Sequence, residues 1–380
     1  MQPSAVDSMD KYNENLTDVK EIFRKGDLRA IPKPLLKWYD NNRRILPWRE
    51  DPAPYRVWVS EIMLQQTRVE AVKPYFQRFM ETLPDIAALA QAPEEVLLKL
   101  WEGLGYYNRV RNLQKAAIQI MEDYGGVMPD SYEELLKLKG IGSYTAGAVS
   151  SIAYGKPNPA VDGNVLRVIA RVRKDERCIS EDMWEVIPTD RPGDFNQAMM
   201  EIGACVCIPN GAPHCEECPL QQICLANADG TQLQYPNKAK AKERTVEEKT
   251  ILIIRDAELA ALHKRPAKGL LAGMYEFPSM KGYHTAEEVK EYLAENGLQV
   301  LRIQPLEDAK HIFSHREWHM KGYLIRVDEL APKREGPDSA DWIYIEPSET
   351  REKYPIPSAF AVYAKGLNMK LGARENDPGQ

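Results

Sequence analysis

The sequence predicts an all-α region followed by an α+β domain, and three observations support this division. Residues 28–228 follow a helical pattern that Pro and Gly turns interrupt. Residues 229–249 are polar and nearly free of large apolar side chains, as expected of a linker. Residues 250–365 mix strand and helix patterns, and we expect a polar segment at 1–27 and a loose tail at 366–380.

Composition limits the classes of protein to which the chain can belong. Its 380 residues are 43% apolar, enough for two cores. No apolar run could span a membrane and the first residues do not resemble a signal peptide, so we expect a soluble intracellular protein without a membrane partner. We also expect a monomer. The net charge of −6 weighs against nucleic acid as a partner, but binding depends on local basic faces, and Lys and Arg do cluster in several stretches.

The first predicted helix, WVSEIMLQQTRVE at residues 58–70, directs its apolar residues to a core. We expect Pro74 to end or kink it. Glu61 lies beside the face that should be driest, and hydrogen-bonding residues follow soon after. A carboxyl group among apolar neighbours is a candidate for chemistry rather than an ordinary exposed side chain.

A helical hairpin is predicted further along. Ser131–Glu134 has the pattern of a capping box and should start a helix that ends at Gly140, and residues 138–146 lead into a second helix. Backbone N–H groups around Gly140 and Gly142 would then point outward and hold a phosphate, with an ordinary turn as the alternative. Asp194–Gln197 should start another helix in the same way.

The pattern changes in the last third of the chain. Thr250–Ile254 and Gly322–Val327 are typical of strands, and Glu287–Asn296 is typical of a helix. We therefore expect an α+β domain after the linker.

Five of the six cysteines fall within residues 205–224, which indicates local chemistry rather than a disulfide framework. Four of them, with the spacing C-x7-C-x2-C-x5-C, are Cys207, Cys215, Cys218 and Cys224. Four thiolates in one loop fit either Zn²⁺ or a [4Fe–4S] cluster, and the spacing does not decide between these. Cys178 and Cys205 are predicted to be core thiols.

Ala160–Asn164 follows the hairpin, and this order resembles the helix-hairpin-helix DNA glycosylase superfamily, in which a catalytic aspartate follows the hairpin. The resemblance places that role on Asp162, which could also cap the next helix. Several motifs in order are similar to adenine DNA glycosylases of the MutY type over residues 30–365. They are Leu46–Arg49, Val59–Thr67, Gly103–Tyr107, Gly142–Ala146 and Val161–Asn164.

The resemblance also implies a cofactor. Glycosylases of the endonuclease III and adenine branches carry an iron–sulfur cluster at this point in the chain, so we expect a structural [4Fe–4S] cluster on the loop 207–224. The first gap between cysteines is one residue longer here than is usual in the family.

Removing a base passes through an oxocarbenium-like sugar, which requires an acid for the base and a carboxylate near the sugar. The resemblance implies that Glu61 protonates adenine and activates water, and that Asp162 stabilises the oxocarbenium ion or forms a transient covalent sugar intermediate. Tyr144 would support the sugar intermediate, and Asn164 would orient Asp162. Glycosylases that also cut the strand place a Schiff-base lysine where Tyr144 stands, so we expect an enzyme that only leaves an abasic site.

DNA contacts follow from the same resemblance. Tyr106 would wedge into the duplex, Gln66 would fill or read the opened stack, and Thr67 would contact the opposite base. The residues expected to line the adenine pocket are Trp48, Arg49, Leu64 and Glu201. The structural alternatives are a core aromatic for Tyr106, a surface amide for Gln66 and an ordinary helical residue for Glu201.

Gly269–Pro278 resembles the segment that precedes the catalytic box of Nudix domains. The box itself is degraded, since Ala294 stands where a metal-binding glutamate belongs, so pyrophosphohydrolase activity is not expected. The following Phe-Ser-His sequence resembles a loop that reads 8-oxoguanine. The implied recognition residues are Phe313, Ser314 and His315.

The expected function is removal of adenine mispaired with 8-oxoguanine or guanine in double-stranded DNA, in the cytoplasm or at a bacterial nucleoid, with nucleus or mitochondrion as alternatives. A pyrimidine glycosylase or lyase of the endonuclease III sort, a catalytically silent iron–sulfur DNA-binding protein and a Nudix hydrolase are the competing hypotheses.

Overall fold

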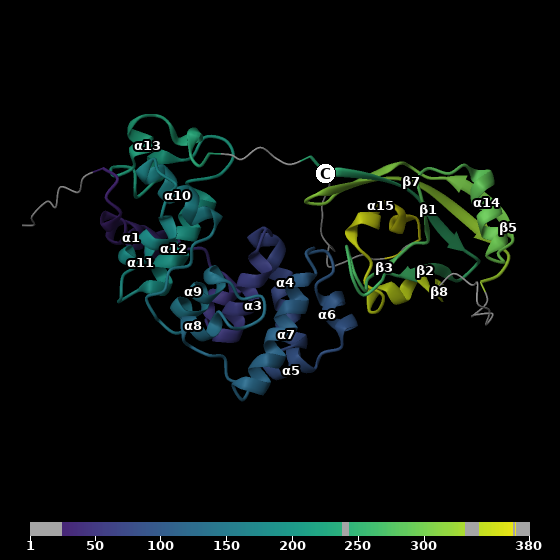
Figure 1. The fold of residues 1–380 in the computed structure, drawn as a ribbon, viewed down its shortest axis with the longest axis horizontal. Helices are drawn as coiled ribbons and strands as arrows, with labels where there is room; N and C mark the ends of the chain where they lie inside the picture. The colour runs from purple at the N-terminus through teal and green to yellow at the C-terminus, as the bar shows by residue number, and fades with distance from the viewer. Residues whose placement is uncertain (1–24, 238–242, 331–341, 368, 370–380) are drawn as a thin grey trace, which may run out of the picture. The chain divides into compact units, whose positions relative to one another are not determined.

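A computed structural model of the chain describes residues 25–237, 243–330, 342–367 and 369 (Figure 1). Most of the predicted N-terminal segment and of the predicted tail lies outside these residues. The chain divides into two compact units: residues up to 44 together with 155–238, and residues 45–154 together with those from 239 onward. The helical region predicted over 28–228 is therefore shared between the units.

The first unit is helical. Its helices are α1 (Pro32–Asn42), α10 (Gly163–Arg173), α11 (Ile179–Val186), α12 (Pro192–Cys205) and α13 (Leu225–Ala228). Helix α10 is strongly amphipathic and buries Val165, Val168 and Ile169 against Phe195 and Ile202 of α12. These contacts fix the N-terminus of α10, which matters for the site below.

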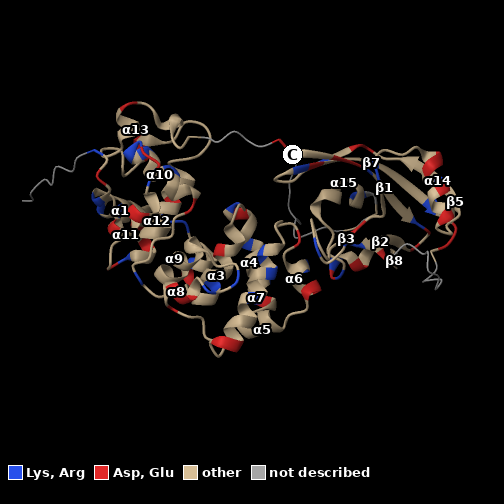
Figure 2. Ribbon diagram, viewed as in Figure 1, with Lys and Arg blue, Asp and Glu red and all other residues tan. Residues whose placement is uncertain are grey.

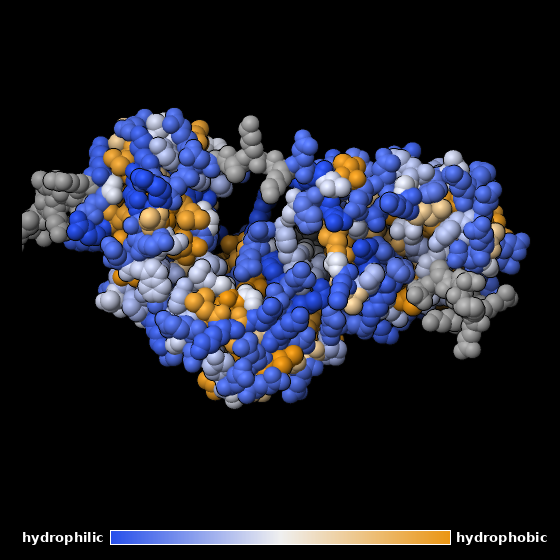
Figure 3. Space-filling view, viewed as in Figure 1, coloured by the Kyte–Doolittle hydropathy of each residue, from blue (hydrophilic) through white to orange (hydrophobic). Residues whose placement is uncertain are grey.

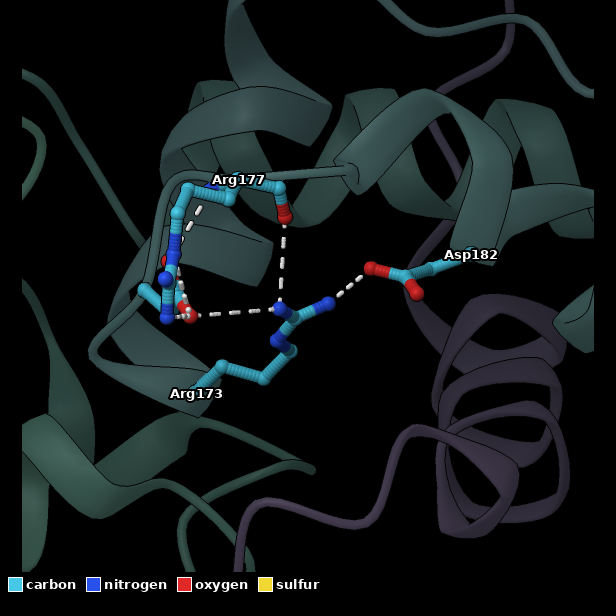
Figure 4. A network of polar contacts seen from close by, with 4 residues as sticks. Arg173, Arg177 and Asp182 are labelled. Carbon is cyan, nitrogen blue, oxygen red and sulfur yellow. Dashed lines mark hydrogen bonds and ion pairs between the residues drawn. The ribbon is translucent and has the colours of Figure 1, made fainter.

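The loop between α10 and α11 is held by charges (Figure 4). Arg173 forms an ion pair with Asp182 and donates to the backbone oxygen of Arg177 at 3.2 Å. Arg177 also donates to Asp175 at 2.7 Å, and this hydrogen bond holds the pKa of Asp175 below its usual range. The loop begins with Lys174 at a φ of 55°, a left-handed residue that ends α10.

Helical residues of the second unit form a core of their own. The helices are α2 (Pro47–Glu50), α3 (Pro54–Leu64), α4 (Val69–Thr82), α5 (Ile86–Gln91), α6 (Glu94–Leu100), α7 (Asn108–Asp123), α8 (Tyr132–Leu135) and α9 (Ser143–Ile152). Their core includes the fully buried Trp58, Phe79 and Trp101. Helix α3 is buried on nearly every side, which is unusual for a helix that carries a carboxyl group.

The prediction of one helix over residues 58–70 is wrong. Helix α3 ends at Leu64, and Gln66 takes a left-handed φ of 58°, which breaks the helical path before α4 begins. Pro74 does not end a helix but lies inside α4. The missing N–H of Pro74 removes one hydrogen bond, and the burial of Tyr75, Phe76 and Phe79 offsets that loss.

Two helix boundaries also differ from the prediction. Ser131 caps α8 as expected, accepting from the Glu134 N–H at 3.2 Å, but α8 ends at Leu135 rather than at Gly140. Tighter backbone bonds, such as that from Leu138 N–H to the Leu135 oxygen, replace the helix there. Helix α12 begins at Pro192, two residues before Asp194, because proline suits the first helical position.

The C-terminal part of the second unit is an eight-stranded sheet with the path β3-β2-β1-β7-β5. Its elements are β1 (Thr245–Arg255), β2 (Ala260–Lys264), β3 (Tyr275–Glu276), β4 (Ser279–Lys281), α14 (Ala286–Glu295), β5 (Val300–Pro305), β6 (Ala309–Ile312), β7 (Arg316–Val327), β8 (Trp342–Ile345) and α15 (Ala361–Ala364). Strand β4 pairs with β1, β6 with β7, and β8 with β2, while β1 and β7 run parallel.

Both faces of this sheet are covered. In β1, Ile251 and Ile253 pack in a cluster that includes Tyr363 of α15, whereas Leu252 and Ile254 pack in one with Leu293 of α14 (Figure 1). A strand buried on both faces explains the unbroken apolar run. Because β1 begins at Thr245, residues 245–249 belong to the strand and not to the predicted linker. Strand β7 likewise begins six residues before the predicted 322–327.

The sheet domain is bonded to the helical part of the second unit. Arg111 of α7 donates to the backbone oxygen of Ala272 at 2.5 Å. The buried Glu102 accepts from the N–H of Ile356 at 2.6 Å. Met274 adds its side chain to the helical core. These contacts join the helical part of the second unit to its sheet domain.

Charged residues of both signs are interspersed along the ribbon (Figure 2), and the face drawn in Figure 3 is mainly hydrophilic with small hydrophobic patches. Within the described residues, no helix is long and apolar enough to cross a membrane. Cys178 and Cys205, predicted to lie in the core, are exposed: each stands at the end of a helix, where the core does not reach.

Candidate active site

Glu61 lies deep in the second unit, and only 4% of its surface is exposed to solvent. It belongs to α3, and Tyr144 belongs to α9, which packs on α3. The hydroxyl of Tyr144 donates a hydrogen bond to Oε2 of Glu61. The sequence stretches that suggested a chemical role for each residue are thus joined by one polar contact inside an apolar helix pair.

Asp162 is the N-cap of α10 in the first unit. Its Oδ1 accepts from the backbone N–H groups of Asn164 and Val165 at 2.9 and 2.8 Å, and its Oδ2 accepts from Nδ2 of Asn164 at 2.7 Å. Both carboxylate oxygens are therefore oriented by the helix that Asp162 begins. A Cβ on Gly203 would lie 2.5 Å from the Cβ of Asn164, so glycine is required there for Asn164 to keep its place.

Arg167 connects this capped carboxylate to the cysteine loop. Its Nη2 donates to Oδ1 of Asn164 at 2.8 Å, and its Nε donates to the backbone oxygen of Cys207 at 2.8 Å. Arg171, one turn later on α10, donates to Sγ of Cys207 at 3.2 Å. The sequence patterns did not single out these buried arginines for this purpose.

One pocket is lined by the four cysteines Cys207, Cys215, Cys218 and Cys224. Its empty volume is about 390 Å³, part of which is open to solvent. Burial raises the pKa of the Cys218 thiol to about 12. Within the described residues, no three His, Cys, Asp or Glu side chains are grouped closely enough to hold a metal ion.

The predicted hairpin is present, with α8 and α9 as its helices. Gly140 has a φ of 79°, and a Cβ there would lie 2.7 Å from the Cβ of Asn112. Gly142 caps α9 and faces open space. Ile141 is buried between them, so the turn is anchored while its backbone faces outward.

Two exposed side chains project from turns with left-handed backbone. Gln66 follows α3 at a φ of 58°, and Tyr106 precedes α7 at a φ of 49° and is 53% exposed. Thr67 is half-buried beside Gln66. Tyr106 is thus not a core aromatic, and its position remains compatible with the predicted wedge.

The residues predicted to line an adenine pocket divide between the units. In the second unit, Trp48 is buried and packs edge-on against Phe76, with the ring centroids 5.4 Å apart. Arg49 is half-buried in α2, and Leu64 is half-buried at the end of α3. In the first unit, Glu201 of α12 is 1% exposed and forms a bidentate ion pair with Arg44 at 2.6 and 2.9 Å. Arg44 was a missed partner, because nothing in the spacing of the two residues links them.

The lesion-reading loop predicted in the sheet domain joins β6 to β7. Phe313 is held between His311 and Trp318, with ring centroids 4.7 and 4.8 Å away. Ser314 and His315 are exposed. The hydroxyls of Ser314 and Tyr106 lie 2.7 Å apart, so the loop and the predicted wedge share a hydrogen bond within the second unit.

Comparisons with known proteins agree with this arrangement. Residues 59–188 match the family model described as HhH-GPD superfamily base excision DNA repair protein, and residues 250–365 match that of the NUDIX domain. A solved structure, a trapped covalent complex of endonuclease III with DNA, is 26% identical; the match covers 55% of this chain and 99% of that one, with a TM-score of 0.48. The two family models thus match a helix-hairpin-helix base excision repair region and a Nudix-like region.

More specific relatives are known. The adenine DNA glycosylase of Mus musculus is 36% identical over 387 residues, which cover 84% of this chain and 74% of that protein. That of Buchnera aphidicola is 36% identical over 308 residues, which cover 78% and 87%. The chain belongs to the adenine DNA glycosylase family, which confirms the resemblance and the fold class predicted from sequence.

The capping geometry of Asp162 predicts how its variants affect stability. Asp162→Ala should lower the free energy of unfolding by about 1 kcal/mol, because α10 loses its cap. Asp162→Asn should lose less than Asp162→Ala, since asparagine caps equally well and only the acceptor for Nδ2 of Asn164 is lost. Denaturant unfolding of the full chain, monitored by the helical signal in circular dichroism, measures both changes. Equal losses of stability in the two variants would contradict the cap.

Proposed function

We propose that the chain is a base excision repair enzyme that hydrolyses the N-glycosidic bond of adenine mispaired with 8-oxoguanine or guanine in double-stranded DNA, acting as a monomer. The observation that carries the proposal is the buried Glu61 carboxyl group, which is hydrogen-bonded to Tyr144 in the helical core. The chain that contains this pair belongs to the adenine DNA glycosylase family. Burying a carboxyl group costs free energy even where a hydrogen bond offsets part of it, and such costs are characteristic of sites that perform chemistry.

In the proposed reaction, the flipped adenine receives a proton from Glu61 at N7, and the bond between N9 and the sugar breaks. The sugar is left as an oxocarbenium ion, which the carboxylate of Asp162 stabilises electrostatically. Water then attacks the anomeric carbon and gives its proton to the Glu61 carboxylate. Asn164 and two backbone N–H groups hold Asp162 in place for this step.

Tyr144 supports a reaction that stops at the abasic site. A lyase needs an amine that forms a Schiff base with the sugar, and a phenol cannot form one. Tyr144 instead orients Glu61 through its hydrogen bond. This counts against the pyrimidine lyase hypothesis, and the adenine glycosylase relatives count against a catalytically silent protein or a Nudix hydrolase.

The lesion-reading role of the sheet domain rests on its loop. Phe313 is fixed by His311 and Trp318, so it presents the neighbouring Ser314 on an exposed and anchored turn. A hydroxyl can donate to or accept from the groups that distinguish 8-oxoguanine from guanine. We therefore assign the discrimination to Ser314, with Phe313 packing near the base and His315 positioning the loop.

A [4Fe–4S] cluster is the proposed cofactor. Each iron of such a cluster takes one cysteine, whereas a structural zinc draws all four sulfurs to about 2.3 Å from one ion. The four cysteines that line one pocket would supply one thiolate to each iron. Arg171, buried against Cys207, places a positive charge beside thiolates. Bound there, the cluster would brace the loop that follows α12.

The main test measures release of adenine and pyrimidines from duplexes with A opposite 8-oxoguanine, A opposite G, or an oxidised pyrimidine. We expect adenine release alone, with strand cleavage only after alkali. Glu61→Gln should slow release by roughly 100-fold to 10,000-fold while duplex binding persists, because the group that donates and accepts the proton is lost but the size of the side chain is kept. Full activity in Glu61→Gln would remove Glu61 from the mechanism, and release of pyrimidines would favour the endonuclease III-like hypothesis.

Ser314→Ala should reduce the preference for 8-oxoguanine over guanine by about 5-fold to 150-fold, the factor for about 1–3 kcal/mol of lost or unpaired hydrogen bonding, without stopping adenine release. Because Ser314 also contacts Tyr106, the matched variant is Tyr106→Phe, which removes only that contact. Its ratio of rates for the two mispairs should stay near that of the wild type. Equal ratios in wild type and Ser314→Ala would contradict the assignment.

The cofactor proposal predicts a coloured protein. The protein, purified without oxygen, should absorb broadly in the visible range and carry about four iron atoms per chain, whereas a zinc site is colourless. Cys218→Ser should lose iron and absorption, and the matched variant Cys205→Ser, at an exposed cysteine outside the set, should keep both. Stoichiometric zinc in a colourless protein would refute the cluster.

A further inference from the structure

We propose that Arg109 is a positioning residue that clamps the two turns carrying Gln66 and Tyr106, so that both side chains enter DNA as one rigid pair. The inference rests on the proposed function, since it assigns the pair to unstacking the target base. Arg109 belongs to one of the basic clusters of the sequence, with Arg111 and Lys115, but no motif assigned it an individual role.

The guanidinium of Arg109 spans both turns. Its Nη1 donates to the backbone oxygens of Ile62, Met63 and Gln65 at 2.9, 3.1 and 2.5 Å. Its Nη2 donates to those of Leu104 and Gly105, each at 3.1 Å. One planar group thus satisfies carbonyls from two separate segments of the chain, residues 62–65 and residues 104 and 105.

The contacts meet a specific need in the turn after α3. The last carbonyls of a helix lack partners within the helix, and the negative end of the helix dipole favours a cation. Arg109 supplies the donors and the charge directly before Gln66, whose left-handed φ is unfavourable for a residue with a side chain. The clamp therefore stabilises a backbone that would otherwise relax.

The second turn is held in the same way. The N–H of Arg109 donates to the backbone oxygen of Tyr106 at 2.8 Å, and its guanidinium lies 5.6 Å from the Tyr106 ring and 5.5 Å from the buried Trp101 ring. Burial lowers the pKa of Arg109 to about 10, so it remains charged at neutral pH. Within the described part of the chain, its charge faces carbonyl dipoles and rings and no carboxylate.

Lysine cannot replace this clamp. Its ammonium group is a single point with three donors, whereas the guanidinium presents a planar fork long enough to reach both turns. A loosened clamp would let Gln66 and Tyr106 move independently. The loss should then appear in unstacking of the base, before any bond breaks.

The test uses full-length chain. In single-turnover reactions with A opposite G, Arg109→Lys and Arg109→Gln should each slow adenine release on the order of 100-fold, as small misplacements do. The matched control is Arg78→Gln: Arg78 is also half-buried over an aromatic ring, Tyr75 at 5.0 Å, but touches neither turn. It should stay within about threefold of wild type. A wild type that releases no adenine would refute the proposed function, whereas Arg109 variants at the control rate would refute only the clamp.

Two further readouts separate positioning from general stability. In the Glu61→Gln background, 2-aminopurine beside the target adenine should brighten when protein binds, and adding Arg109→Lys should abolish the brightening while Arg78→Gln keeps it. Without DNA, amide hydrogen exchange in Arg109→Lys should accelerate at residues 62–67 and 103–107 alone. Retained brightening, unchanged exchange, or loss of protection throughout the second unit would each overturn the clamp.

Discussion

The hydrogen bond from Tyr144 to the buried carboxyl group of Glu61 is the constraint on which the proposed chemistry depends. A polar group inside an apolar helix pair costs free energy unless it is bonded, so α3 and α9 must pack in a way that keeps the phenol and the carboxyl together. The hairpin that precedes α9 sets where this helix begins. The outward backbone of the hairpin and the inward carboxyl group are therefore consequences of one packing arrangement.

In the first unit, a carboxylate is likewise held in place by hydrogen bonds, but the donors are different. Asp162 is fixed by capping the helix that its own segment begins, and Asn164, Arg167 and the backbone of Cys207 continue the polar chain into the cysteine loop. A change in the loop can therefore reach the carboxylate through three hydrogen bonds. The proposed cluster would thus have a structural role, since the proposed chemistry uses no metal.

The contrast between what the sequence predicted and what it missed follows from the range of each interaction. Pattern identified the helix caps Ser131 and Asp162 and the apolar run of β1, because these act through neighbours in the chain. The break at Gln66, which contacts from the distant Arg109 stabilise, was predicted wrongly. So was the end of α8 at Leu135, where tighter local bonds replace the helix. Arg44 with Glu201, and Arg109 with its two turns, pair residues across long stretches of chain. Only a folded backbone shows such partners. The roles of Glu61 and Asp162 came from family resemblance, and neither was evident from local pattern alone.

The central claim is that Glu61 and Asp162 act on the same flipped nucleotide. A crystal structure of the chain bound to a duplex with a non-hydrolysable adenosine analogue opposite 8-oxoguanine tests it most directly. The account predicts the Glu61 carboxyl within hydrogen-bonding distance of N7 of the extruded base, and the Asp162 carboxylate facing the sugar of the same nucleotide. An extruded nucleotide that contacts neither carboxyl group would contradict it. So would one that contacts a single carboxyl group while the other opens onto solvent.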